Sequence, residues 1–521
     1  MNEKQKSNTL ISGAAWLALS TIILKIIGLI YKIPLSYMLG DEGMGYFNSA
    51  YTVYVFFYVI GTAGIPKAIS ILVAKREAER QGTGDAAFRS AFRFFFVLGV
   101  ILLAIFLLGA DAFASAIGNP KATLAMYSIA PSVLFVCAGG VIRGYLSGRM
   151  KFSPIAISEL ISGVLKLVIG LLLARIAIQM GKSLPTVAAY TILGITVGSL
   201  ISLIYLALVY SKHSQKACKH TEKGIIKDIL GIAIPITLAS AVASIVNILD
   251  LTVIMNGLED SGFAPSVSNV LYGNYTTLAV PMLSLVSTLI SPITTAILPM
   301  LASTHIKKGR EEYSGHLGFA LTVTSFLTVP AGIMFACFSS EILSVIFEES
   351  SAILGAPFLA ALSPAVLLLG PLVVINTALE AAGKPTTAFI SLSVGALVKL
   401  TLGVCLLKYT DLGVLSAPIG TSVSYAVSYC ISRITIAKMK DVKLSVFKSL
   451  AAPFIASSLS AFLTLNLLKL LDFSTTSRLS GLLCIAVFGV FYLALSLALS
   501  PKARNILFNC IKMNKKRTNH L

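Results

Sequence analysis

The chain has 521 residues, of which 56% are hydrophobic and only 12% are charged, and its mean hydropathy is +0.87. A soluble globular protein carries roughly 25% charged residues, so this composition argues against a soluble enzyme. The formal net charge of +19 is spread between apolar segments, which argues against nucleic-acid binding and indicates loops that face an anionic membrane leaflet.

The apolar runs predict an all-α, polytopic membrane protein with about fourteen transmembrane helices, since each span needs about 20 apolar residues. A closed barrel would alternate apolar and polar residues, and these runs are apolar throughout. The first run is too long for a signal peptide, so we interpret it as the first span. In chain order, the spans are expected at residues 10–33, 46–74, 91–108, 124–145, 154–178, 187–210, 229–255, 272–298, 317–338, 353–375, 386–407, 413–436, 446–470 and 481–499.

The charges of the predicted loops alternate along the chain and indicate the orientation. The basic loops and tail contain Lys75, Arg76, Arg80, Arg149, Lys151, Lys212, Lys216, Lys307, Lys308, Arg310, Lys438, Lys440, Lys515 and Lys516. The opposite loops contain Asp41, Glu42, Asp111, Glu259, Asp260, Glu341, Glu348, Asp411 and Asp472. The positive-inside rule therefore predicts that both termini are cytoplasmic, in a bacterial cytoplasmic membrane.

Short motifs recur at a constant shift, which predicts two related halves. Pro131-Ser132-Val133-Leu134 matches Pro364-Ala365-Val366-Leu367, a shift of 364 − 131 = 233, and Val141-Ile142 matches Val374-Ile375. We expect an N-terminal lobe at 1–210, a basic cytoplasmic linker at 211–227 and a C-terminal lobe at 228–440. Residues 441–521 then hold two extra helices and a basic tail. Repeats of this parallel kind place a substrate site between lobes, near the bilayer midplane.

Ionisable groups inside the spans are candidates for function, because inserting each costs roughly 2.5–3.5 kcal/mol. Lys166 and Lys399 occupy equivalent positions in the repeat, again at a shift of 233. Lysines facing the interlobe space predict a site for an anionic substrate such as a phosphate-bearing headgroup. The full set of candidates is Lys25, Lys32, Glu159, Lys166, Asp250, Glu380 and Lys399.

Structural explanations for these charges stay open. Lys25 and Lys32 can snorkel to the interface, and Lys166 and Lys399 can pair with Glu159 and Glu380 as bridges. Asp250 is either interfacial or a cation or proton site. Arg143, near the inner end of the fourth span, is expected to face the cytoplasm.

Enzymatic and metal chemistry is not visible in the sequence. No H-E-x-x-H motif occurs, and the seven cysteines form no C-x-x-C pair. Gly181-Lys182-Ser183 lacks the upstream glycine of a phosphate-binding loop, because Ile176 stands there. We expect no cofactor, no metal and no ATPase activity, so energy would come from ion gradients, membrane potential or substrate supply.

The N-terminal motif resembles that of the polysaccharide-biosynthesis flippases. It reads Lys25-Ile26-Ile27-Gly28-Leu29-Ile30-Tyr31-Lys32-Ile33-Pro34-Leu35, then Leu39-Gly40-Asp41-Glu42-Gly43-Met44-Gly45-Tyr46, and later Gly64-Ile65-Pro66. The stage V sporulation protein B group and the MurJ-type lipid II flippases are the nearest branch. They share a superfamily with multidrug (MATE) exporters and Wzx-type flippases.

This resemblance implies a MATE/MurJ-like fold, a central cationic cavity for a polyprenyl-diphosphate sugar and a groove for its lipid tail. Basic residues of the first span line the family's cavity, and here those positions are Lys25 and Lys32, followed by the acidic Asp41. Tyr275 stands where some lipid II flippases carry a basic residue in the eighth span.

We therefore expect a flippase that moves an undecaprenyl-diphosphate-linked cell-wall precursor by alternating access, with lipid II the leading candidate. The expected partners are this lipid-linked saccharide and membrane lipids, with the cell-wall synthesis machinery as a candidate. An ion-coupled exporter of MATE type is the alternative, although it would favour acidic residues in its cavity. A capsule or spore-cortex precursor, or a channel or scaffold, also stays open.

Overall fold

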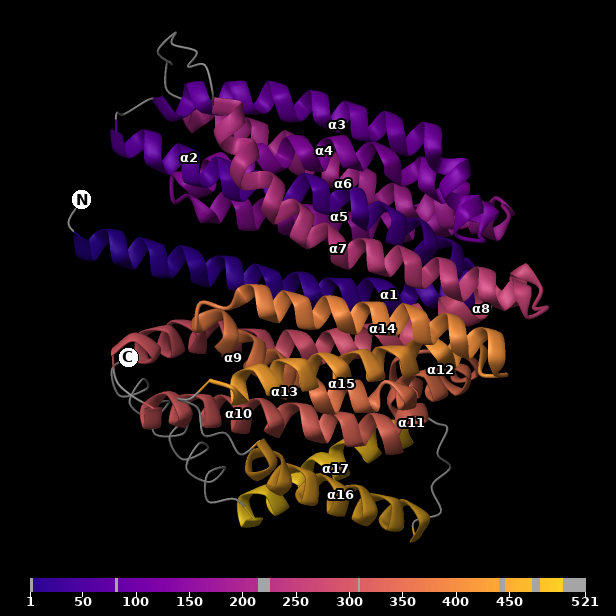
Figure 1. The fold of residues 1–521 in the computed structure, drawn as a ribbon. Helices are drawn as coiled ribbons and strands as arrows, with labels where there is room; N and C mark the ends of the chain where they lie inside the picture. The colour runs from indigo at the N-terminus through magenta and orange to yellow at the C-terminus, as the bar shows by residue number, and fades with distance from the viewer. Residues whose placement is uncertain are drawn as a thin grey trace. The chain divides into compact units, whose positions relative to one another are not determined.

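The computed structural model describes residues 3–79, 83–213, 225–307, 310–439, 446–470 and 478–499. These residues form helices and short connections, without a strand among them (Figure 1). Thirteen helical stretches are long and apolar enough to cross a membrane. The first of these, Ile26–Arg76, covers the end of the first predicted span, 10–33, and all of the second, 46–74, so the prediction of about fourteen helices is confirmed.

Packing divides the chain into two compact units, Met1–Thr277 and Leu278–Leu521. The first contains α1 (Glu3–Thr62), α2 (Ile65–Glu79), α3 (Thr83–Ala116), η1 (Pro120–Ala122), α4 (Thr123–Gly148), α5 (Phe152–Gln179), α6 (Leu184–His213), α7 (Ile225–Asp260) and α8 (Pro265–Asn274). It also contains the start of a π-helical segment, η2 (Tyr275–Ala279).

The second unit begins within η2 and follows the same all-helical plan. It contains α9 (Val280–Lys307), α10 (Arg310–Cys337), α11 (Ser339–Ile346), α12 (Glu349–Ala361), α13 (Ser363–Ala381), α14 (Pro385–Tyr409), η3 (Gly413–Leu415), α15 (Ser416–Ala437), α16 (Val446–Leu470) and α17 (Arg478–Leu499).

Gly40 breaks α1 into the first and second predicted spans. Its φ is 63° and its ψ is 179°, so α1 consists of two helices joined at this residue. This backbone region is essentially restricted to glycine, because a side chain would clash there. The change of direction between the two spans therefore takes place at a single residue.

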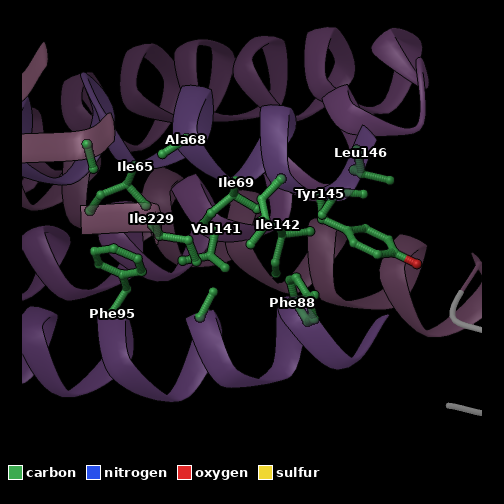
Figure 2. Packing of buried hydrophobic residues seen from close by; sticks show 14 of the residues in the cluster. Ile65, Ala68, Ile69, Phe88, Phe95, Val141, Ile142, Tyr145, Leu146 and Ile229 are labelled. Atoms are coloured by element: carbon green, nitrogen blue, oxygen red, sulfur yellow. The ribbon is translucent and has the colours of Figure 1, made fainter. Parts of the chain in front are cut away.

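The core of the first unit lies between α2, α3, α4 and α7. Ile69 of α2, Phe95 of α3, Ile142 of α4 and Ile229 of α7 are among its buried members, as Figure 2 shows. Gly144 of α4 permits the close approach to α2, because an added Cβ would lie 2.7 Å from the carbonyl oxygen of Pro66. Apolar side chains and small residues together set this packing.

The second unit repeats this arrangement. α13 packs on α9, α10 and α15, as α4 packs on α2, α3 and α6, and α14 packs on α15 as α5 packs on α6. The repeated pair Val141 and Ile142 lies in the first core, and Val374 and Ile375 lie in the second. The repeat predicted from sequence is therefore present in the packing of both units.

The last two helices have no counterpart in the first unit. α16 packs on α10 and α17, and α17 packs on α11. The Tyr492 hydroxyl of α17 donates a 2.9 Å hydrogen bond to the Phe326 carbonyl of α10. These helices are the two extra spans expected at the C-terminus.

The packing boundary differs from the boundary expected between lobes. We expected the linker at 211–227, of which residues 214–224 lie outside the described part of the chain. α7 and α8 follow that linker, yet α7 packs on α1, α2 and α3, and α8 packs on α1. The expected boundary is based on the sequence repeat and stays a prediction.

Candidate functional site

The site begins where Lys32 of α1 meets the π-helical segment η2. The ammonium of Lys32 donates a 3.2 Å hydrogen bond to the backbone carbonyl of Thr276. Thr276 is five residues before Pro281, and a π-helical carbonyl takes its hydrogen bond from the residue five positions later. Because proline has no N–H, the carbonyl needs another donor, and Lys32 provides it.

Asn48 also attaches α1 to this segment. Its side-chain amide donates hydrogen bonds of 2.9 Å to the Thr276 hydroxyl and 2.8 Å to the Thr277 hydroxyl. Asn48 is 6% exposed, so these bonds are formed away from bulk solvent. The π-helical segment is thus held by α1 at both its backbone and its side chains.

A buried polar network positions α8 against α1. The amide of Asn119 donates to Ser49 at 2.9 Å and to Asn269 at 2.7 Å. Gly45 and Gly273 let the two backbones approach closely, since a Cβ on Gly273 would lie 2.6 Å from the Gly45 nitrogen. This close packing brings η2 beside Lys32.

Lys166 of α5 reaches the same region from the other side of α1. Its ammonium lies 5.1 Å from the centroid of the Tyr31 ring and 5.0 Å from that of the Tyr51 ring. Such cation–π contacts stabilise a charge that has left water. Gly170 and Gly194 allow α5 and α6 to pack tightly behind it, because a Cβ on Gly194 would lie 2.6 Å from the Gly170 Cα.

The two ammonium groups are close enough to act on each other electrostatically. Both lysines are partly buried. Their contacts among the described residues are a carbonyl and two aromatic rings, and no carboxylate is one of them. Two cations without an anion in an apolar unit favour binding of an anion, because its charge would offset their mutual repulsion.

Acidic residues lie beside this cluster. The Asn274 amide donates a 3.2 Å hydrogen bond to Asp41 just after the break in α1. The charge of Asp250 acts on Tyr272, whose hydroxyl is 3.4 Å from that of Thr52. Tyr275, which follows Asn274 directly, is 4% exposed. Asp41 and Asp250 thus lie near residues that directly precede η2, and Tyr275 is the first residue of η2.

Other predicted residues are not brought into this cluster. The side chain of Lys25 lies outside the part that the structure describes, although its backbone belongs to α1. Lys399 and Glu380 belong to the second unit, where Lys399 is partly buried near Tyr425 and Glu380 is exposed. Their roles in a shared site stay predictions.

Arg143 of α4 is partly buried and lies near aromatic and acidic residues of α1 and α5. We expected it to face the cytoplasm, which stays a prediction, and its Nε is buried without a hydrogen-bond partner among the described residues. Its charge acts on Tyr54 and Tyr58 of α1 and on Glu159 of α5. Glu159 therefore lies near Arg143, and Lys166 contacts the tyrosine rings instead of pairing with Glu159.

The aromatic partners of this site were not predicted from the sequence. Consecutive ring centroids from Tyr31 to Phe47, Tyr51, Tyr54 and Tyr58 are between 5.8 and 6.2 Å apart. The spacing of residues 47, 51, 54 and 58 by three or four positions is a signal that could have indicated one helical face.

The fold and the charges define a multi-pass α-helical membrane protein with a partly buried cationic site. The chain belongs to the polysaccharide biosynthesis protein family, whose pattern it matches over residues 10–305. Stage V sporulation protein B of Bacillus subtilis (strain 168) is 24% identical over 502 residues, which cover 94% of this chain and 95% of that protein. Lipid II flippase MurJ of the same organism is 22% identical over 427 residues, which cover 77% of this chain and 78% of that protein.

Solved structures share the fold. Lipid II flippase MurJ in an inward closed conformation superposes with a TM-score of 0.67 at 18% identity, over 94% of this chain and 99% of that one. An inward-facing multidrug resistance MATE family transporter of the MOP superfamily has a TM-score of 0.64 at 16% identity, over 83% of this chain and 100% of that one. The expected MATE/MurJ-like fold is therefore confirmed.

Proposed function

We propose that this protein is a flippase that translocates a polyprenyl-diphosphate-linked saccharide, with lipid II as the leading candidate, across the bacterial cytoplasmic membrane. The observation that carries the proposal is the pair Lys32 and Lys166, two ammonium groups without a carboxylate contact among the described residues. A diphosphate would neutralise both charges. Lys25 of α1 is proposed to add to this site during transport, and Lys399 of the second unit is proposed to contact the same substrate.

The relatives support the same class of substrate. MurJ of Bacillus subtilis is named a lipid II flippase, and the family is described as polysaccharide biosynthesis proteins. The larger share of the chain matches stage V sporulation protein B, which leaves the choice between growth and sporulation to experiment. We infer lipid II because it combines a diphosphate with a saccharide and a polyprenyl tail.

Lysine as the main ligand has a chemical consequence. An ammonium is a point charge that binds phosphate without the paired, planar hydrogen bonds of arginine. Lys32 and Lys166 would therefore attract the diphosphate without fixing one orientation, which suits a ligand that must enter on one side and leave on the other.

A MATE-type exporter of cationic drugs is the second candidate on fold similarity. Such a cargo would be repelled by Lys32 and Lys166, whose charges already repel each other. The charge of the site therefore favours the anionic lipid.

The test is translocation by purified protein in liposomes that contain lipid II. Wild-type protein should make lipid II accessible at the opposite leaflet, and the double variant K32Q/K166Q should lose this activity. K182Q, which changes an exposed lysine next to the fifth span, is the matched control and should behave as wild type. Transport of a cationic dye by wild type, without movement of lipid II, would contradict the proposal.

A further inference from the structure

A row of tyrosines on α1 connects two groups of charges. The ring centroids of Tyr51 and Tyr54 are 5.9 Å apart, and those of Tyr54 and Tyr58 are 5.8 Å apart. Residues at spacings of three and four leave the same face of a helix. We call Tyr51, Tyr54 and Tyr58 the tyrosine row.

The two ends of the tyrosine row face different charges of α5. Lys166 lies over Tyr51 at 5.0 Å, and the charge of Glu159 acts on Tyr58. Tyr51 and Tyr58 are seven positions apart on α1, or about 10 Å along the helix axis. Glu159 and Lys166 have the same separation on α5. Because α1 and α5 pack on each other, these contacts mark two ends of one continuous face.

Arg143 joins this face from α4 at the Glu159 end. Its charge acts on Tyr54, Tyr58 and Glu159. Its buried Nε has no hydrogen-bond partner among the described residues. A buried donor without an acceptor is costly, so native proteins rarely retain one without a reason such as a ligand.

α4 has little freedom to move Arg143 away. The neighbouring Gly144 packs against α2, and a Cβ on Gly140 would lie 2.7 Å from the Gly61 carbonyl oxygen of α1. The guanidinium is therefore carried by a helix whose backbone is tightly held. An acceptor for its Nε must come from a side-chain rearrangement or from a bound molecule.

We propose that Tyr51 and Tyr58 of the tyrosine row, with Arg143 and Glu159, form a saccharide subsite, which contacts the glycan while Lys32 and Lys166 hold the diphosphate; Tyr54, which is 3% exposed, supports the row from the core. This inference rests on the proposed function, because it assigns a second part of the same lipid-linked substrate. Aromatic faces offer apolar contact to the C–H faces of sugar rings. The guanidinium donates to sugar oxygens, and the carboxylate of Glu159 accepts from sugar hydroxyls.

The chemistry of this face suits a neutral, hydroxyl-rich group better than a second phosphate. Arg143 is accompanied by Glu159, whose negative charge would repel a phosphate but accept hydrogen bonds from hydroxyls. Aromatic walls with a few placed polar groups are typical of small-molecule sites. The Lys32 and Lys166 end, in contrast, offers positive charge without a carboxylate contact.

Two lipid probes separate the subsite from the diphosphate site. Purified wild-type protein, R143Q and E159Q are titrated with lipid II and with undecaprenyl diphosphate, which lacks the glycan, and binding is followed by native mass spectrometry. R143Q and E159Q should weaken lipid II binding by about tenfold, the worth of one hydrogen bond to a charged group. Their affinity for undecaprenyl diphosphate should be unchanged, which also shows that they fold.

R175Q and a pair of Tyr58 variants complete the design. Arg175 is an exposed arginine on α5, so R175Q should leave both affinities at the wild-type level. Y58F keeps the ring and should retain lipid II binding, whereas Y58L should weaken it selectively.

Equal losses for both probes would assign Arg143 to the diphosphate site and overturn the saccharide subsite. Unchanged binding of both probes by R143Q and E159Q would overturn it as well. If wild-type protein binds undecaprenyl diphosphate and lipid II with equal affinity, the saccharide subsite is overturned and the proposed function still stands. Wild-type protein that binds neither probe would contradict the proposed function itself.

Discussion

Lys32 and Thr276 are joined by a hydrogen bond of 3.2 Å between an ammonium and a backbone carbonyl, 244 positions apart in the chain. The carbonyl lacks a helical donor because Pro281 follows it five residues later. Lys32 therefore has two roles, as a charge available to an anion and as a donor that completes the π-helical segment. An anionic ligand that draws Lys32 away would free the carbonyl, which couples binding to the conformation of η2.

The first prediction concerns the structural role of Lys32. K32M should unfold below K166M by the equivalent of roughly 1–3 kcal/mol, because both variants relieve the repulsion between the two ammonium groups but only K32M leaves the Thr276 carbonyl without its donor. The thermal unfolding midpoint of purified protein in detergent measures this. K227M removes an exposed lysine of α7 and should leave the midpoint unchanged. An equal midpoint for K32M and K166M would show that the hydrogen bond contributes nothing.

The second prediction concerns the break in α1 at Gly40. G40A should destabilise the protein by about 1–3 kcal/mol, because alanine is strained at this φ and ψ. G28A is the matched control in the same helix, since an added Cβ at Gly28 meets nothing within 4 Å. Thermal unfolding of both variants should show a loss for G40A only. A lower unfolding midpoint for G28A and an unchanged midpoint for G40A would contradict the strained backbone conformation at Gly40.

The third prediction concerns the close packing of α1 and α8. A Cβ at Gly273 would collide with the Asp41 carbonyl oxygen, so G273A should cost about 1–3 kcal/mol through overpacking. G231A places its Cβ in open space on α7 and should be tolerated. Thermal unfolding of both variants measures this, and the midpoint of G273A should lie below that of G231A. Equal midpoints would mean that the two backbones are farther apart.

The fourth prediction concerns orientation. The positive-inside rule places Lys182 outside the cell and Lys151 in the cytoplasm. In a variant without native cysteines, K182C should react with a membrane-impermeant maleimide in intact cells, whereas K151C should react only after lysis. The reverse labelling would invert the proposed topology.

The number and order of the helices could be predicted because hydrocarbon requires long apolar runs with internal backbone hydrogen bonds. The repeat was also visible, since equivalent core pairs such as Val141-Ile142 and Val374-Ile375 keep their identity. Lys32 and Lys166 were found because charge inside an apolar run is a strong local signal.

The partners of these charges could not be predicted, because they depend on how distant helices pack. Nothing near Lys32 in sequence points to Thr276. Nothing near Arg143 in sequence points to Tyr54, Tyr58 or Glu159, on which its charge acts. The packing of α4 on α1 decides its environment, and single-sequence periodicity does not contain that information.

The most direct test of the central claim is native mass spectrometry of protein purified gently from bacterial membranes. Wild-type protein should retain a polyprenyl-diphosphate-linked saccharide, and K32Q/K166Q should lose it while K182Q keeps it. Equal retention of that lipid by K32Q/K166Q, or wild-type protein that carries only ordinary phospholipids, would contradict the assignment of these lysines to an anionic lipid headgroup.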